Sequence, residues 1–174
     1  TIARATEFFL SAEKVAAVGI GSFGPVDLTP ASPSYGWITS TPKSGWRNTD
    51  IVGMLGKALG VPVLFDTDVN AAALGEHIWG SAQGIDNFVY LTVGTGIGGG
   101  TMINGRLTHG LVHPEMGHLR VPHDLNADDF VGSCPYHGDC LEGLASGPAI
   151  EQRWGSPAQS LAEHDLVWEL EAVY

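Results

Sequence analysis

Five glycines within seven positions follow an apolar strand, and this segment constrains the fold more than any other. The strand is FVYLTV at 88–93, and the glycines stand at 94, 96, 98, 99 and 100. Backbone without side chains can approach phosphate oxygens and point several N–H groups at them. The segment also matches G-x-G-x-x-G, but a dinucleotide-binding fold needs a helix directly after that turn. Here Asn104-Gly105 follows between two short strands and predicts a β-hairpin, which excludes the dinucleotide fold. A tight turn without a ligand is the alternative.

Strands and helices alternate along the rest of the chain. We expect strands at 15–20 and 61–65. We expect helices at 2–14, 69–79 and 157–173. Two more helices are predicted from their caps: one runs from Thr49 or Asp50 to Leu59, and one begins at Ser146, with Pro148 in its first turn. Two glycine-rich turns lead into extended segments rather than helices. The pattern therefore predicts an α/β fold with mixed sheets and a boundary near residues 80–86.

Charge and composition exclude several classes of protein. The formal net charge is −11, from 19 acidic and 8 basic side chains, so nucleic acid is not an expected partner. No apolar run approaches the length that spans a membrane, and the first residues do not resemble a signal peptide. Two cysteines are too few for a disulfide scaffold and indicate a reducing compartment, which predicts a cytoplasmic location.

Two aspartates stand where a strand gives way to an alanine-rich helix. Asp66 and Asp68 follow the run that ends at Phe65. Carboxylates at strand ends in α/β folds often face the ligand crevice, and transfer of a phosphoryl group to an alcohol needs a base near the hydroxyl. Asp68 is the better candidate, because it stands at the mouth of the helix. Capping of that helix is the alternative function of Asp68.

A long loop from His109 to Glu142 contains both cysteines of the chain. Cys134-x-x-His137-x-x-Cys140 offers three ligands of the kind that zinc prefers in tetrahedral sites. The fourth ligand remains open among the histidines of the loop, at positions 109, 113, 118 and 123. Two reduced cysteines beside a surface histidine are the alternative.

Two glutamates flank this loop. A metal-stiffened loop would hold Glu115 and Glu142 rigidly, which suits recognition of a substrate with many hydroxyl groups. The ordinary alternative is that both are solvated surface acids.

Taken together, the motifs resemble the ROK family of sugar kinases and repressors. The matching stretches keep the family order: G-I-G-S-F-G-P at 19–25, D-T-D-V-N-A-A-A-L-G-E at 66–76, T-V-G-T-G-I-G-G-G at 92–100, H-P-E-M-G-H at 113–118 and C-P-Y-H-G-D-C-L-E-G-L-A-S-G-P at 134–148. The F-G-P variant, S-G-W at 44–46, Thr67 and the Cys-Pro-Tyr-His form are most similar to the bacterial zinc-containing fructokinase branch.

The resemblance implies an actin-like (ribonuclease H-like) ATPase fold of two lobes with mixed sheets, incomplete at both ends. Residues 1–84 would belong to the N-terminal lobe, which ends in the catalytic aspartate and a linking helix. Residues 85–174 would belong to the C-terminal lobe, with the phosphate-binding hairpin and the zinc loop. A first phosphate loop and an adenine-binding part of the family have no counterpart in this sequence. The resemblance also implies a homodimer.

The activity implied is that of an ATP:hexose 6-phosphotransferase, with D-fructose as the expected sugar and ATP and Mg²⁺ as cofactors. The residues carried over from the family motifs are the base Asp68, the sugar contacts Gly24, Pro25, Glu115, His118 and Glu142, the ATP-phosphate contacts Gly94, Thr95, Gly96 and Gly98, and the zinc ligands His118, Cys134, His137 and Cys140. Thr67 stands where many relatives have asparagine, so the resemblance assigns no sugar contact to this position. Kinases of glucose, mannose or N-acetylhexosamines, a sugar-sensing repressor domain and an inactive truncated fragment are the alternatives.

Overall fold

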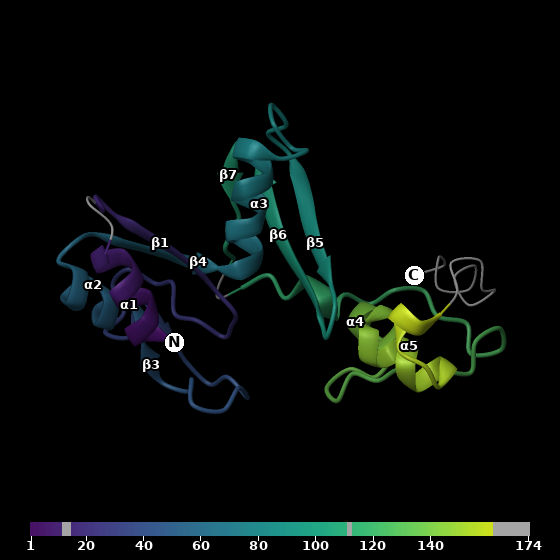
Figure 1. Ribbon diagram of the computed structural model, residues 1–174. Coiled ribbons are helices and arrows are strands. Elements are labelled where there is room, and N and C mark those ends of the chain that lie inside the picture. Colours follow the sequence, from purple (N-terminus) through teal and green to yellow (C-terminus); the bar gives the residue numbers. More distant parts are fainter. Residues whose placement is uncertain (12–14, 111–112, 162–174) are drawn as a thin grey trace. The chain divides into compact units, whose positions relative to one another are not determined.

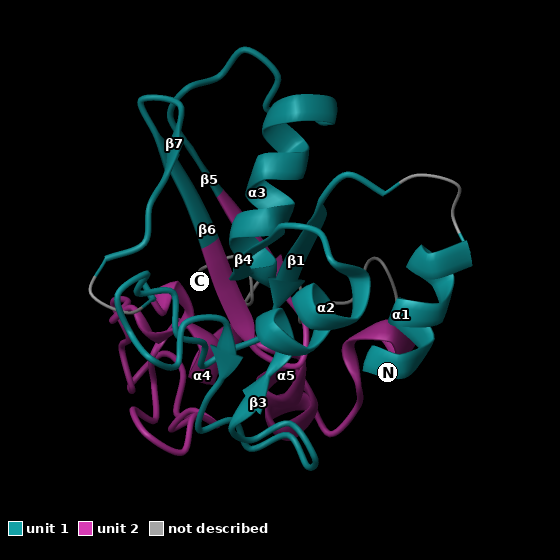
Figure 2. Cartoon of the chain, turned by 90° about the vertical axis from the view of Figure 1, so that its left-hand side faces the viewer, with its two compact units in different colours: residues 1–89, 100–114 teal, residues 90–99, 115–174 magenta. Residues whose placement is uncertain are grey.

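A computed structural model describes residues 1–11, 15–110 and 113–161 of the chain (Figure 1). The chain divides into two compact units: unit 1 comprises residues 1–89 with 100–114, and unit 2 comprises residues 90–99 with 115–174 (Figure 2). The expected lobe boundary at residue 84 stays a prediction. Among the described residues, no helix has the length and apolar character needed to cross a bilayer.

Unit 1 contains most of the regular structure. Its elements are α1 (Ile2–Ser11), β1 (Val18–Ser22), β2 (Trp37–Ile38), β3 (Thr49–Asp50), α2 (Ile51–Leu59), β4 (Val63–Thr67), α3 (Asp68–Trp79) and β7 (Arg106–Leu107). β1 and β4 form a parallel pair whose register runs from Val18↔Val63 to Ser22↔Thr67. The buried core of this unit consists of Val26, Ile38, Ile51, Leu55 and Phe65.

The sheet that carries the glycine segment has the order β5-β6-β7. β5 (Phe88–Val93) and β6 (Ile97–Ile103) each pass from one unit into the other, and β6 pairs antiparallel with β7. Asn104 and Gly105 both have positive φ, at 51° and 70°, as a two-residue hairpin of this type requires. The predicted hairpin is therefore confirmed.

Unit 2 contains short helices and a long loop. Its remaining elements are η1 (Met116–His118), α4 (Leu141–Ala145), α5 (Gly147–Trp154) and η2 (Ala158–Ser160). Ser146 caps α5 through its side chain, with Pro148 in the first turn, as predicted. Of the helix expected at 157–173, the described part is η2, and residues 162–174 lie outside the described residues.

The start of α3 is packed against β6 at Gly100. A Cβ atom on Gly100 would overlap the carbonyl oxygen of Val69 in the first turn of α3. Gly100→Ala should therefore lower the free energy of unfolding by about 1–3 kcal/mol, as overpacking does. Gly19→Ala is the matched control, because a Cβ there meets open space, and its effect should stay within about 0.5 kcal/mol. Denaturant unfolding of both variants measures the difference, and equal stabilities would contradict the packing argument.

Candidate functional site

The junction between β4 and α3 leaves the Asp68 carboxylate available for chemistry. Thr67 is the N-cap of α3, and its hydroxyl accepts the N–H of Asn70 at 3.2 Å. Asp68 is the first helical residue and is exposed. Its Oδ1 accepts the N–H of the adjacent Val69 at 2.9 Å, and the carboxylate makes no other hydrogen bond with a described residue. Because Thr67 performs the capping, the alternative that Asp68 is the cap is wrong.

The loop after β1 lies beside this junction. In the parallel pair Ser22 stands opposite Thr67, so Phe23 to Pro25 and Asp68 emerge at the same edge. The Gly24–Pro25 peptide bond is cis, and the Pro25 carbonyl accepts hydrogen bonds from the backbone N–H and the hydroxyl of Thr39 at 2.8 and 3.0 Å. Unit 1 therefore brings together Asp68 and the Gly24-Pro25 loop.

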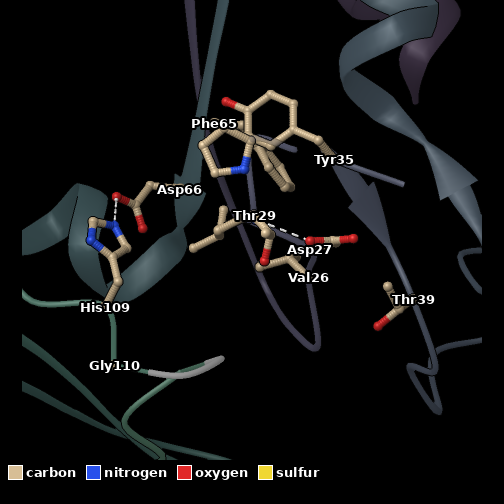
Figure 3. A pocket seen from close by; sticks show the side chains of 11 residues that line it. Val26, Asp27, Thr29, Tyr35, Thr39, Phe65, Asp66, His109 and Gly110 are labelled. Atoms are coloured by element: carbon tan, nitrogen blue, oxygen red, sulfur yellow. Dashed lines mark hydrogen bonds and ion pairs between the residues drawn. The ribbon is translucent and has the colours of Figure 1, made fainter. Parts of the chain in front are cut away.

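A buried polar network fixes the other aspartate of the pair. Asp66 Oδ1 accepts the N–H of Thr67 at 2.7 Å and the amide of Asn70 at 2.9 Å, and Asn70 is fully buried. Asp66 Oδ2 lies 2.7 Å from Nε2 of His109. A dashed line marks this contact in Figure 3. His109 was a candidate zinc ligand by sequence, and this pairing of residues 43 apart had no local signal.

Asp66 and His109 line a cavity of about 750 Å³ in unit 1 (Figure 3). Its other walls include Phe65, Tyr35 and the segment around Asp27. The hydroxyls of Ser32 and Ser34 and the backbone N–H of Thr29 donate to the Asp27 carboxylate and lower its pKa to about 2. Both carboxylates of this cavity therefore have their acceptor positions largely satisfied by the protein itself.

In unit 2, the glycine turn keeps some of its backbone donors free. The N–H of Gly94 donates to the carbonyl of Gly96 at 2.9 Å, and Ile97 N–H donates to Glu142. The N–H groups of Thr95 and Gly96 make no hydrogen bond with any described residue. Gly98, the fourth predicted phosphate contact, lies in β6.

A cavity of about 560 Å³ adjoins this turn. Gly94 and Thr95 line one part of it, and Gly147 and Pro148 at the start of α5 line another. The N–H of Gly147 donates to the carbonyl of Gly94 at 2.8 Å and so ties the helix start to the turn. Free N–H groups at a glycine-rich turn, as at Thr95 and Gly96, are suited to phosphate oxygens.

Four side chains of the long loop converge on one point. His118, Cys134, His137 and Cys140 each offer a ligand atom, and these atoms lie within 4.8 Å of one another. Nδ1 of His118 lies 3.8 Å from Sγ of Cys134 and 3.6 Å from Sγ of Cys140. A tetrahedral zinc ion with Zn–S of about 2.3 Å and Zn–N of about 2.0–2.1 Å sets sulfur and nitrogen ligands about 3.6 Å apart. The residues present therefore fit zinc.

The structure settles which histidine completes the cluster. His109 contacts Asp66, and His123 lies 3.6 Å from Asp128 and 3.5 Å from Asp139. His113 is not part of the group either. Burial raises the pKa of the Cys140 thiol, with the Cys134 thiol beside it as a further cause. A bound cation would reverse this effect, because zinc binds the thiolate.

The two flanking glutamates have different environments. Glu115 is exposed, has φ 46° and ψ 48°, and makes no side-chain hydrogen bond with a described residue. A left-handed conformation is uncommon for a residue with a side chain and is often retained at functional sites. Glu142 is half-buried, and its carboxylate contacts the glycine turn. The view that both are ordinary surface acids is therefore wrong for Glu142.

Comparisons with known proteins show the family of this chain. A sequence model of the ROK family matches residues 1–172. Fructokinases of Lactococcus lactis subsp. cremoris and Zymomonas mobilis subsp. mobilis are 48% and 50% identical, and the matches cover 100% of this chain but 59% and 60% of theirs. The chain thus spans about 60% of the length of these curated relatives.

Solved structures show the same similarity. A ROK hexokinase from Thermus thermophilus is 34% identical, with a TM-score of 0.72 over 90% of this chain and 53% of that one. A ROK family glucokinase from Streptomyces griseus in complex with glucose and AMPPNP is also 34% identical, with a TM-score of 0.60 over 87% of this chain and 46% of that one.

Proposed function

Because this chain belongs to the ROK family and has the actin-like ATPase fold of its kinases, we propose that it serves ATP-dependent phosphorylation of a hexose at the 6-hydroxyl. D-Fructose is the proposed sugar, and fructose 6-phosphate and ADP are the products. The observation that carries the proposal is the exposed Asp68 carboxylate at the strand end, together with the fructokinases among the relatives.

In this proposal Asp68 is the general base. Its carboxylate accepts the proton of the 6-hydroxyl while the hydroxyl oxygen attacks the γ-phosphorus and ADP departs. Thr67 supports this role, because it caps α3 and leaves Asp68 free. Gly24 and Pro25 are proposed to shape the sugar pocket, since their loop emerges beside Thr67 at the same strand edge.

The nucleotide is proposed to bind at the glycine turn of unit 2. The free N–H groups of Thr95 and Gly96 and the cavity that Gly94 and Thr95 line support this. Gly98 is proposed as a further contact from the family motif. Mg²⁺ bound together with ATP would neutralise part of the negative charge of the phosphates. AMPPNP in the Streptomyces griseus relative supports a nucleotide as ligand.

The sugar hydroxyls are proposed to contact Glu115, His118 and Glu142. The left-handed backbone of Glu115 and its free carboxylate support the first contact. His118 uses Nδ1 toward the two thiols, which leaves Nε2 for a hydroxyl. Zinc would be held by His118, Cys134, His137 and Cys140 and would stabilise the loop. We also propose that the protein is a homodimer and lies in the cytoplasm. Both cysteines are free, which is consistent with a reducing compartment.

A coupled assay of ADP release by the full-length protein tests the function. We expect kcat/KM for fructose to exceed that for mannose and glucose by at least about tenfold, because pocket contacts set such ratios. Preference for glucose or mannose would assign the chain to another kinase of the family. Absence of ADP release with every hexose would refute the kinase proposal.

A further inference from the structure

A carboxylate oxygen of Glu142 is hydrogen-bonded to the backbone of the glycine turn. Oε2 of this residue, the second of α4, accepts the N–H of Ile97 at 2.8 Å. A Cβ atom on Gly96 would come within 2.6 Å of the same oxygen, so the absence of a side chain there admits the carboxylate. The contact joins residues 45 apart in the sequence. It therefore links the helix that follows the metal cluster to the turn.

Two further contacts within unit 2 hold the same turn. The N–H of Gly147 donates to the carbonyl of Gly94, and Gly117 packs so closely on Ile97 that a Cβ would overlap its carbonyl oxygen. Glycine loses more conformational entropy on ordering than any other residue. A turn this rich in glycine therefore needs contacts with other segments to keep a fixed conformation. The hydrogen bond from Ile97 to the Glu142 carboxylate is the charge-assisted one among these contacts.

We propose that Glu142 is a positioning residue for the nucleotide. Its carboxylate holds the N–H of Ile97 and thereby fixes the turn in the shape that leaves the N–H groups of Thr95 and Gly96 for the phosphates. The inference rests on the proposed function, because it requires a nucleotide at the turn. It is compatible with the proposed sugar contact, because Ile97 uses only Oε2, while Oε1 makes no hydrogen bond with a described residue.

Nucleotide binding without sugar separates the two functions of Glu142. The dissociation constant of Mg-AMPPNP, measured by calorimetry on the full-length protein, should rise about tenfold in Glu142→Ala, as loss of one hydrogen bond from a charged group predicts. Glu142→Gln should raise it by only about threefold, because the amide oxygen still accepts the same N–H but without the charge. Glu7→Ala, on the exposed α1, is the control and should change nothing.

A purely sugar-binding Glu142 would leave the Mg-AMPPNP constants of all variants equal, and that result would overturn the proposal. Failure of the wild type to bind Mg-AMPPNP would instead refute the proposed function itself. Amide exchange by NMR needs no variant, so it decides the question even if Glu142→Ala does not fold. We expect slow exchange of the Ile97 amide in the wild type without nucleotide, and exchange at the rate of an unprotected amide would overturn the positioning role.

Discussion

Asp68→Asn should lower kcat by about 10²–10⁴-fold, the contribution of a positioned general base. The substitution keeps the side-chain oxygen that accepts the N–H of Val69, and Thr67 still caps α3. The fold and the affinity for the hexose should therefore change little. Steady-state kinetics and sugar binding by calorimetry measure the two quantities separately.

Asp50→Asn is the matched control for this change. Asp50 caps α2 by accepting the N–H of Gly53 at 2.7 Å, and asparagine is an equally good cap. This variant should keep both its stability and its kcat. If Asp68→Asn retained more than about a tenth of wild-type turnover, well above what loss of a general base leaves, Asp68 would not be the base.

Cys140→Ser should abolish the proposed zinc binding and remove much of the order of the loop in unit 2. Cys140 is fully buried, and its side chain makes no capping hydrogen bond to α4, so the substitution acts through the cluster rather than through the helix cap. Structural zinc contributes about 10–16 kcal/mol of binding free energy in small zinc domains, far more than a single side-chain contact. We expect metal analysis to give about one zinc per wild-type chain, since the four ligands fill one tetrahedral site.

Thermal unfolding and metal content of the variant give the two measurements. Leu125→Ser is the control, because Leu125 is an exposed residue of the same loop, outside the cluster. It should keep the zinc and the melting temperature. A stably folded wild-type protein that binds no zinc after purification without chelators and addition of the metal would contradict the assignment.

Local signals predicted much of unit 1 correctly. The end of α2 followed from Gly60, which has φ 68°, and of the two candidate caps Thr49 and Asp50 the structure has Asp50. The Asn104-Gly105 hairpin followed from its turn chemistry. The strand was expected at 15–20, but β1 runs from Val18 to Ser22. Pairing with β4 sets its limits, rather than the apolar run of the strand itself.

The contacts that define the site were harder to predict. The spacing of Cys134, His137 and Cys140 identified three of the four residues of the cluster. Spacing alone did not select His118 among the histidines, because the loop that separates it from the cysteines has no periodic pattern. The Asp66–His109 pair and the Glu142–Ile97 bond join segments more than 40 residues apart. Pairs of this kind depend on how whole elements pack and leave no pattern in a short window of sequence.

The two acids of the Asp66-Thr67-Asp68 segment differ in one further respect. Asp66 has a side chain that is 21% exposed and is held by hydrogen bonds from Thr67, Asn70 and His109, whereas Asp68 is exposed and accepts one bond. A carbodiimide with an amine nucleophile should therefore label Asp68 and spare Asp66, although the two carboxyl groups are neighbours in the chain. Peptide mass mapping of the labelled protein would thus report on the reactivity of the strand end without any substitution.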